Sequence, residues 1–80
     1  MRMVINPSEL KLHDVVVAVA YKCAGTTGTL IKGYQYKIIH KELDGRYFDI
    51  ISETGTEHEC VKVADGIRFR HLYKNEAKRC

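Results

Sequence analysis

Residues 28–40 read GTLIKGYQYKIIH, a glycine-bounded segment that leads into a run of alternating large apolar and polar side chains. Alternation with a period of two is typical of a β-strand with one buried face. Tyr34, Tyr36 and Ile38 fall on one face, and the other face carries Gln35, Lys37, Ile39 and Lys41. We therefore predict a strand over residues 34–43 with its tyrosine side in the core.

The flanking sequence repeats this pattern at short intervals. Segments rich in Val, Ile, Tyr and Phe predict further strands at residues 15–21, 47–52, 57–63 and 67–72. They are separated by a loop at residues 23–28, an Asp44-Gly45 hairpin turn, a turn at residues 53–56 and a short connector at residues 64–66. A helical turn is expected at residues 7–10, because Pro7 suits a first helical position.

The order of these elements predicts an all-β fold, a five-stranded SH3-like small barrel with a short N-terminal segment and a basic C-terminal tail. An OB-type barrel needs a helix between its third and fourth strands, and residues 53–56 are too few for one. Alternation points Tyr47, Asp49, Ile51, Arg68 and Arg70 outward. The predicted core is Val17, Val19, Leu30, Tyr36, Ile38, Phe48, Ile50, Val61, Ile67 and Phe69.

The length of 80 residues predicts a single domain over residues 1–80, with the barrel at about residues 12–72 and the tail at residues 73–80. A chain this short has little room for an enclosed active site. The longest apolar run, at residues 15–21, is too short to cross a bilayer, and the N-terminus lacks a signal-peptide layout. We therefore expect a cytoplasmic protein with no membrane contact.

Charge and cysteines add two further expectations. From Arg68 onward, five basic residues stand against one acidic residue. Such an end is either a solvated terminus or a contact for an acidic partner, and both interpretations stay open. Three cysteines are an odd number, which favours free thiols in a reducing compartment, with Cys80 exposed.

Two motifs carry a family resemblance. The string L-x-K-G-Y-x-Y-x-I-I at residues 30–39 and DGRYFDIISETG at residues 44–55, with a closing Phe69, resemble the small SH3-like domains found in many bacteriophage genomes. The resemblance spans about residues 12–72 and implies the fold and a phage origin, with the host cytoplasm as location. It implies no catalytic residue. This sequence has Ser52-Glu53 where the family often has two consecutive aspartates, and it adds a basic tail after the last strand.

Residue types that support catalysis are present without the spacing that catalysis needs. The glycines of residues 25–33 precede a strand, whereas a phosphate loop precedes a helix. His58 and Cys60 share a face of one predicted strand, but no C-x-x-C or H-x-x-x-H pair completes a zinc site. The simpler interpretation is a buried cysteine and a surface histidine. No spacing unites a nucleophile, a histidine and a carboxylate. We expect no enzyme activity, no cofactor and no metal.

A binding function is the remaining expectation. The outward assignments gather an apolar centre with a basic rim, formed by Tyr47, Ile39 and Ile51 and by Lys37, Arg68 and Arg70. We predict a non-catalytic interaction module that binds a host or phage protein. Nucleic acid is the alternative partner, because exposed aromatic and cationic side chains on small barrels bind strands, although acidic residues are interleaved here. Alternatively, residues 1–5 or the tail cover this patch within the chain, and it is then not available to a partner.

Overall fold

The computed structural model describes residue 5 and residues 9–20, 30–42, 47–62 and 68–80. They form five strands: β1 (Val15–Ala20), β2 (Gln35–Lys41), β3 (Tyr47–Ser52), β4 (Glu57–Lys62) and β5 (Arg68–His71). Each predicted strand is present within the described residues, and the predicted strand ends at residues 21, 43, 63 and 67 lie outside them. The described residues contain no α-helix and no helix that could span a membrane. The all-β assignment is confirmed.

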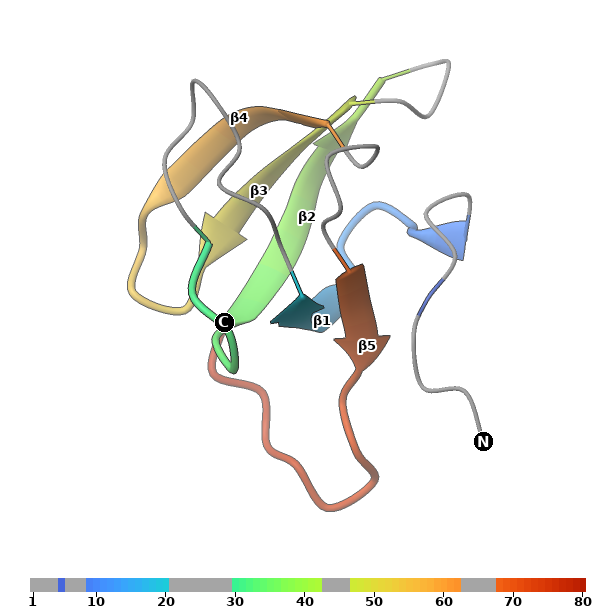
Figure 1. Cartoon of the computed structure of the whole chain (residues 1–80), viewed down its shortest axis with the longest axis vertical. Coiled ribbons are helices and arrows are strands. Elements are labelled where there is room, and N and C mark those ends of the chain that lie inside the picture. The colour runs from blue at the N-terminus through green and yellow to red at the C-terminus, as the bar shows by residue number, and fades with distance from the viewer. Residues whose placement is uncertain (1–4, 6–8, 21–29, 43–46, 63–67) are drawn as a thin grey trace.

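The strands form one antiparallel sheet in the order β4-β3-β2-β1-β5 (Figure 1). Consecutive strands from β1 to β4 are neighbours in the sheet. β5 pairs with the edge of β1 that does not face β2. The backbone amide of Ile5 donates to the Phe69 carbonyl at 2.8 Å, which ties the N-terminal segment to β5. Within the described strands the sheet is open, because β4 and β5 lie at its opposite edges.

One face of this sheet carries the hydrophobic core. The core cluster confirms seven predicted residues: Leu30, Tyr36, Ile38, Phe48, Ile50, Val61 and Phe69. Ile5, Leu10, Val16 and Ala18 join them. Ile67 lies outside the described residues, as do the predicted loop at residues 23–28, the Asp44-Gly45 turn, the connector at residues 64–66 and most of the helical turn at residues 7–10.

Of the two β1 residues predicted in the core, Val17 is buried and Val19 is not. Val16 and Ala18 belong to the core cluster, whereas Val19 is only half-buried. Val17 is also buried, but it pairs with Gln35 on one side and Arg70 on the other, on the opposite face of the sheet. β1 lies inside the sheet between β2 and β5 and has buried residues on both faces, so its apolar run contains no alternation from which to choose a side.

Two β-bulges shift the register around Asp49. In β2, Ile39 is the extra residue between the Ile38–Ile50 and His40–Asp49 pairs. In β4, two residues stand opposite Asp49, between the partners His58 and Val61. Bulges interrupt alternation and bend the strands that contain them. Lys41, expected to face outward, instead pairs with buried Phe48 and donates from its Nζ to the Leu10 carbonyl at 3.0 Å.

The turn at residues 53–56 forms as predicted between β3 and β4. The Gly55 amide donates to the Ser52 carbonyl at 2.9 Å, and Gly55 has a φ of 88°, which glycine adopts without strain. The buried Ser52 hydroxyl accepts from the amides of Thr54 and Thr56. This network fixes the end of β3, where Glu53 begins the turn.

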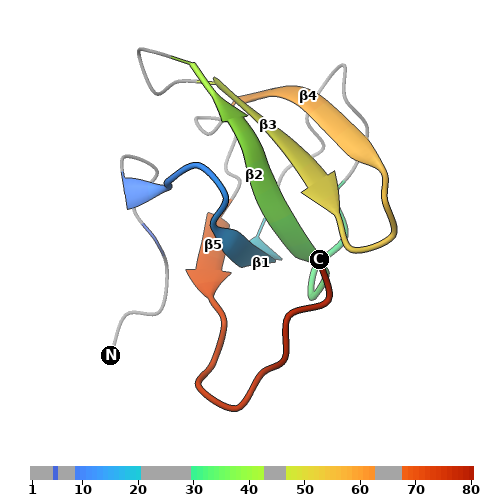
Figure 2. The ribbon, with the colours of Figure 1, turned by 180° about the vertical axis from the view of Figure 1, so that it is seen from behind.

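The C-terminal segment leaves β5, makes a broad loop and returns to the start of β2 (Figures 1 and 2). Its loop begins with a turn in which the Glu76 amide donates to the Tyr73 carbonyl at 2.9 Å. The chain therefore ends beside the face of the sheet opposite the core.

Candidate functional site

Part of the predicted binding patch comes together on the outer face of the sheet. Lys37 and Ile51 are cross-strand partners in β2 and β3, and both are half-buried. Tyr47 lies on the same face of β3 as Ile51 and is 36% exposed. Ile39 is half-buried at the β2 bulge. These four residues lie on two adjacent strands.

The two arginines of the predicted rim lie on another part of the sheet. Arg68 and Arg70 are on β5, which β1 and β2 separate from β3. Arg68 is exposed and stands opposite Ala20. The structure therefore does not gather all six predicted residues into one patch.

Arg70 is engaged by the tail. Its guanidinium forms a two-pronged ion pair with Glu76, at 2.7 Å and 3.3 Å, and its Cζ stands 3.8 Å from the centre of the Tyr73 ring. Hydrogen bonding to Arg70 holds the pKa of the Glu76 carboxyl below its ordinary value, and the same contact raises the pKa of Arg70. The Tyr73 amide also donates to Glu76 at 2.9 Å, which closes the turn at residues 73–76.

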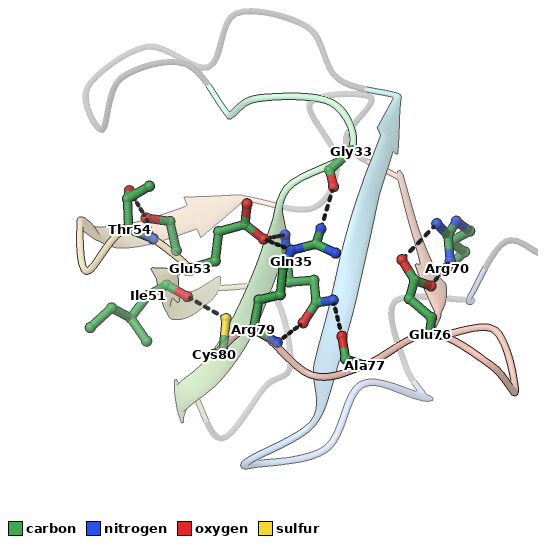
Figure 3. A network of polar contacts seen from close by, with 11 residues as sticks. Gly33, Gln35, Ile51, Glu53, Thr54, Arg70, Glu76, Ala77, Arg79 and Cys80 are labelled. Carbon is green, nitrogen blue, oxygen red and sulfur yellow. Dashed lines mark hydrogen bonds and ion pairs between the residues drawn. The ribbon is translucent and has the colours of Figure 1, made fainter.

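Beyond this turn, the tail crosses the outer face of the sheet and contacts β2 (Figure 3). Gln35 donates from its Nε2 to the Ala77 carbonyl at 2.7 Å, and its Oε1 accepts from the Arg79 amide at 2.6 Å. Gln35 is fully buried, although the alternation placed it outward. The predicted face of Gln35 is correct. Its burial arises from contact with Ala77 and Arg79, which follow it in the sequence by 42 and 44 positions.

Arg79 reaches two further acceptors. Its Nε donates to Glu53 Oε2 at 2.6 Å, and one Nη donates to the Gly33 carbonyl at 3.1 Å. The Arg79 hydrogen bond lowers the pKa of the Glu53 carboxyl. Cys80 follows, exposed and with a free thiol as expected, and its Sγ lies 3.9 Å from the Ile51 carbonyl. Partial desolvation of the thiol against the sheet raises the pKa of Cys80, and the Glu53 charge adds to this effect.

These contacts bear on the two interpretations of the tail, a solvated terminus or a contact for an acidic partner. Residues 73–80 are neither a detached terminus nor a cationic segment with all its charges unpaired, because Arg79 binds Glu53 and Arg70 binds Glu76. The tail also accounts for part of the cover that the sequence left open over the outer face, at Gln35 and beside Ile51. No local pattern signals this docking.

Another feature of the described residues is a hollow with a volume of about 100 Å³. It is lined by Ile31, Tyr34, Tyr36, Ser52, Thr54, Thr56 and His58. Small-molecule sites typically enclose roughly 300–1,000 Å³, so this hollow has space for a side chain rather than a whole substrate.

His58, expected on the surface, is buried instead, with its ring edge-on to Tyr36 at a centroid distance of 5.8 Å. His58 pairs with buried Ile50 and Val61 pairs with buried Phe48, so the β4 bulge between them lets both residues face the core. Within residues 5, 9–20, 30–42, 47–62 and 68–80, no three His, Cys, Asp or Glu side chains are placed to hold a metal ion.

Comparison of the chain with protein-family models, with curated proteins and with solved structures finds no match. The functional argument therefore rests on the geometry of the sheet and its tail.

Proposed function

We propose that this chain is a non-catalytic interaction module of the SH3-like kind, of phage origin, that binds a host or phage protein through the outer face of its sheet. Its order of strands and connections supports the SH3-like assignment, with a long first connection, a tight turn between β3 and β4, and β5 returning to β1. Closure of the sheet into a barrel is part of this proposal.

The observation that carries the proposal is the cross-strand pairing of Lys37 with Ile51, on the face of β3 that also carries Tyr47 four residues earlier in the strand. This arrangement presents an aliphatic side chain, an aromatic ring and an ammonium group on two adjacent strands. Protein interfaces concentrate their binding energy in aromatic residues at the centre of a patch, while charged residues at the rim adjust association rates. Tyr47 and Ile51 form the centre of the proposed interface, Ile39 extends it, and Lys37 lies at its rim.

Two contacts favour protein over nucleic acid as the partner. Arg70 and Arg79 are hydrogen-bonded to carboxylates of the same chain, so binding phosphate would require breaking these ion pairs. A nucleic-acid complex loses affinity steeply with salt, with a slope of about 0.9 log unit per contacted phosphate on duplex DNA. We expect a shallow salt dependence for the partner of this module.

Capture from a bacterial lysate treated with nuclease tests the proposal. We expect a protein to be retained by the wild-type chain, and Tyr47→Ala to weaken that complex by more than ~1 kcal/mol because it removes the aromatic centre. Lys37→Ala, in the same patch, should cost less. Binding of the purified partner is then measured by calorimetry over a salt series.

Circular dichroism of both variants provides the control for folding. Equal affinities of wild type and Tyr47→Ala would contradict the proposed interface. A nucleic-acid partner with a steep salt dependence would contradict the proposed class of partner.

A further inference from the structure

The tail is held on the sheet by contacts that recognise backbone. Gln35 uses both groups of its amide, binding the carbonyl of residue 77 and the amide of residue 79. Along a β-strand, such groups of residues i and i+2 face the same neighbour. Recognition of this pair of groups does not depend on the side chains of Ala77 or Lys78. Gln35 therefore binds the tail much as a neighbouring strand would.

A second set of contacts selects a side chain. The Arg79 guanidinium donates from Nε to the Glu53 carboxylate and from Nη to the Gly33 carbonyl, so two acceptors in different directions are satisfied by one planar group (Figure 3). The ammonium of lysine is a point charge and lacks this fork. The site thus combines general backbone recognition with a preference for arginine.

The acceptors are positioned by the sheet itself. Glu53 Oε2 accepts from the backbone amide of Gln35 at 3.1 Å. The backbone amide of Glu53 donates to the backbone carbonyl of Gln35 at 2.9 Å. Gly33, with a φ of 88°, lies in the turn before β2, where its amide donates to the Ala18 carbonyl. These contacts do not involve the tail, and a site arranged before its ligand arrives loses less entropy on binding.

The segment that occupies this site lies on the surface. Residues 77–80 are exposed along their length, and residues 77–79 are held to the sheet by hydrogen bonds. Segments with few buried apolar contacts open at low free-energy cost. Because the tail belongs to the same chain as the site, its effective concentration there is high, and a competing ligand must overcome it.

We propose that Gly33, Gln35 and Glu53 form a binding site for an arginine-bearing peptide segment of a partner protein, which the chain's own residues 77–79 occupy until that segment displaces them. The inference deepens the proposed function by naming the chemistry of the bound segment, and it rests on that function for its biological role. The required features are an arginine and a free backbone carbonyl two residues before it.

The tail of a second copy of the chain is a less favoured occupant of this site. The turn at residues 73–76 is closed within one chain by the Tyr73 amide, Glu76 and Arg70, and exchange would require opening it. Displacement of residues 77–79 alone leaves these contacts in place.

The test uses the full-length chain with the tail released. In Arg79→Glu, the ion pair with Glu53 becomes a repulsion between like charges, and Arg79→Ala is a milder second variant in case the first does not fold. The probe is the capped peptide Asn-Glu-Ala-Lys-Arg, which repeats residues 75–79. The matched control peptide ends in lysine. Binding is followed by calorimetry and by the NMR signals of the Gln35 side-chain amide.

We expect the arginine peptide to bind the released variants at least about tenfold more tightly than it binds wild type, because the tail no longer reduces the fraction of open sites. The lysine peptide should bind these variants about tenfold more weakly than the arginine peptide. Addition of Glu53→Gln to a released variant should remove most of this difference. The Gln35 side-chain signals should shift only with peptides that bind.

Unchanged Gln35 signals, or equal affinities for the two peptides, would overturn the inference. A wild-type dimer that becomes monomeric in Arg79→Ala, measured by sedimentation, would also overturn it by assigning the site to a second copy. The capture experiment with Tyr47→Ala separates this inference from the proposed function. If the peptides do not bind but a partner is captured that depends on Tyr47, only the inference is contradicted. If the arginine peptide binds but no such partner is captured, only the Tyr47 interface is contradicted.

Discussion

At the scale of single residues, the environment of Gln35 on the outer face depends on the tail. Gln35 is fully buried, and its side-chain amide donates to the Ala77 carbonyl and accepts from the Arg79 amide of the tail. A buried amide is costly unless both its donor and its acceptor are satisfied. The tail supplies one partner for each, so docking of the tail and burial of Gln35 are a single event.

This coupling gives a prediction for Gln35→Ala. The substitution removes two hydrogen bonds, each with a net contribution of about 0.5–1.5 kcal/mol, so we expect the free energy of unfolding to fall by about 1–3 kcal/mol. Urea denaturation measures the loss. In an Arg79→Ala background the same substitution should cost less, because residues that share one network have non-additive effects. Additive losses across this double-mutant cycle would show that Gln35 and Arg79 act independently.

At the scale of elements, the sequence predicted the strands well because their turns and alternation are local signals. Alternation failed where tertiary structure overrides it. The continuous apolar run of β1 cannot show that Val16 rather than Val17 faces the core, and the β2 bulge at Ile39 moves Lys41 toward Leu10. The docking of the tail depends on residues more than 40 positions from Gln35, which no short window contains.

The tail should undock in acid. Its contacts lower the pKa values of Glu53 and Glu76, chiefly through hydrogen bonds from Arg79 and Arg70. A carboxyl whose pKa is lowered by docking contributes stability above its ordinary value of 4.5, and this contribution is lost as the pH falls through the lowered value. We therefore expect the NMR signals of the Arg79 amide and the Gln35 side-chain amide to move together below about pH 4.5.

The variant Glu53→Gln provides the control for this titration. A neutral amide has no proton to gain, so the part of the acid transition that reports Glu53 should disappear, while the Glu76 part remains in the signals of Tyr73. An unchanged transition at Arg79 in this variant would assign the titration to another carboxyl.

At the scale of the whole molecule, a single core cluster supports one sheet of five strands. β5 links this core to both terminal segments, since Phe69 accepts from the Ile5 amide and Arg70 binds Glu76 of the tail. Phe69 itself is buried and edge-on to Tyr36 at a centroid distance of 6.4 Å. Loss of its ring therefore weakens the docking of β5 as well as the core.

We expect Phe69→Ala to lower the free energy of unfolding by about 3–5 kcal/mol, the usual cost of removing a buried aromatic ring. A chain of this length has a total free energy of unfolding of only about 4–12 kcal/mol, so the variant would lose a large part of its stability. Chemical denaturation followed by circular dichroism measures the change, with Lys32→Ala as a surface control expected to lie within about 0.5 kcal/mol of wild type. A loss below about 1.5 kcal/mol for Phe69→Ala would contradict burial of this ring in a well-packed core. Helix-dominated circular dichroism of the wild-type chain would contradict the all-β sheet on which that core is built.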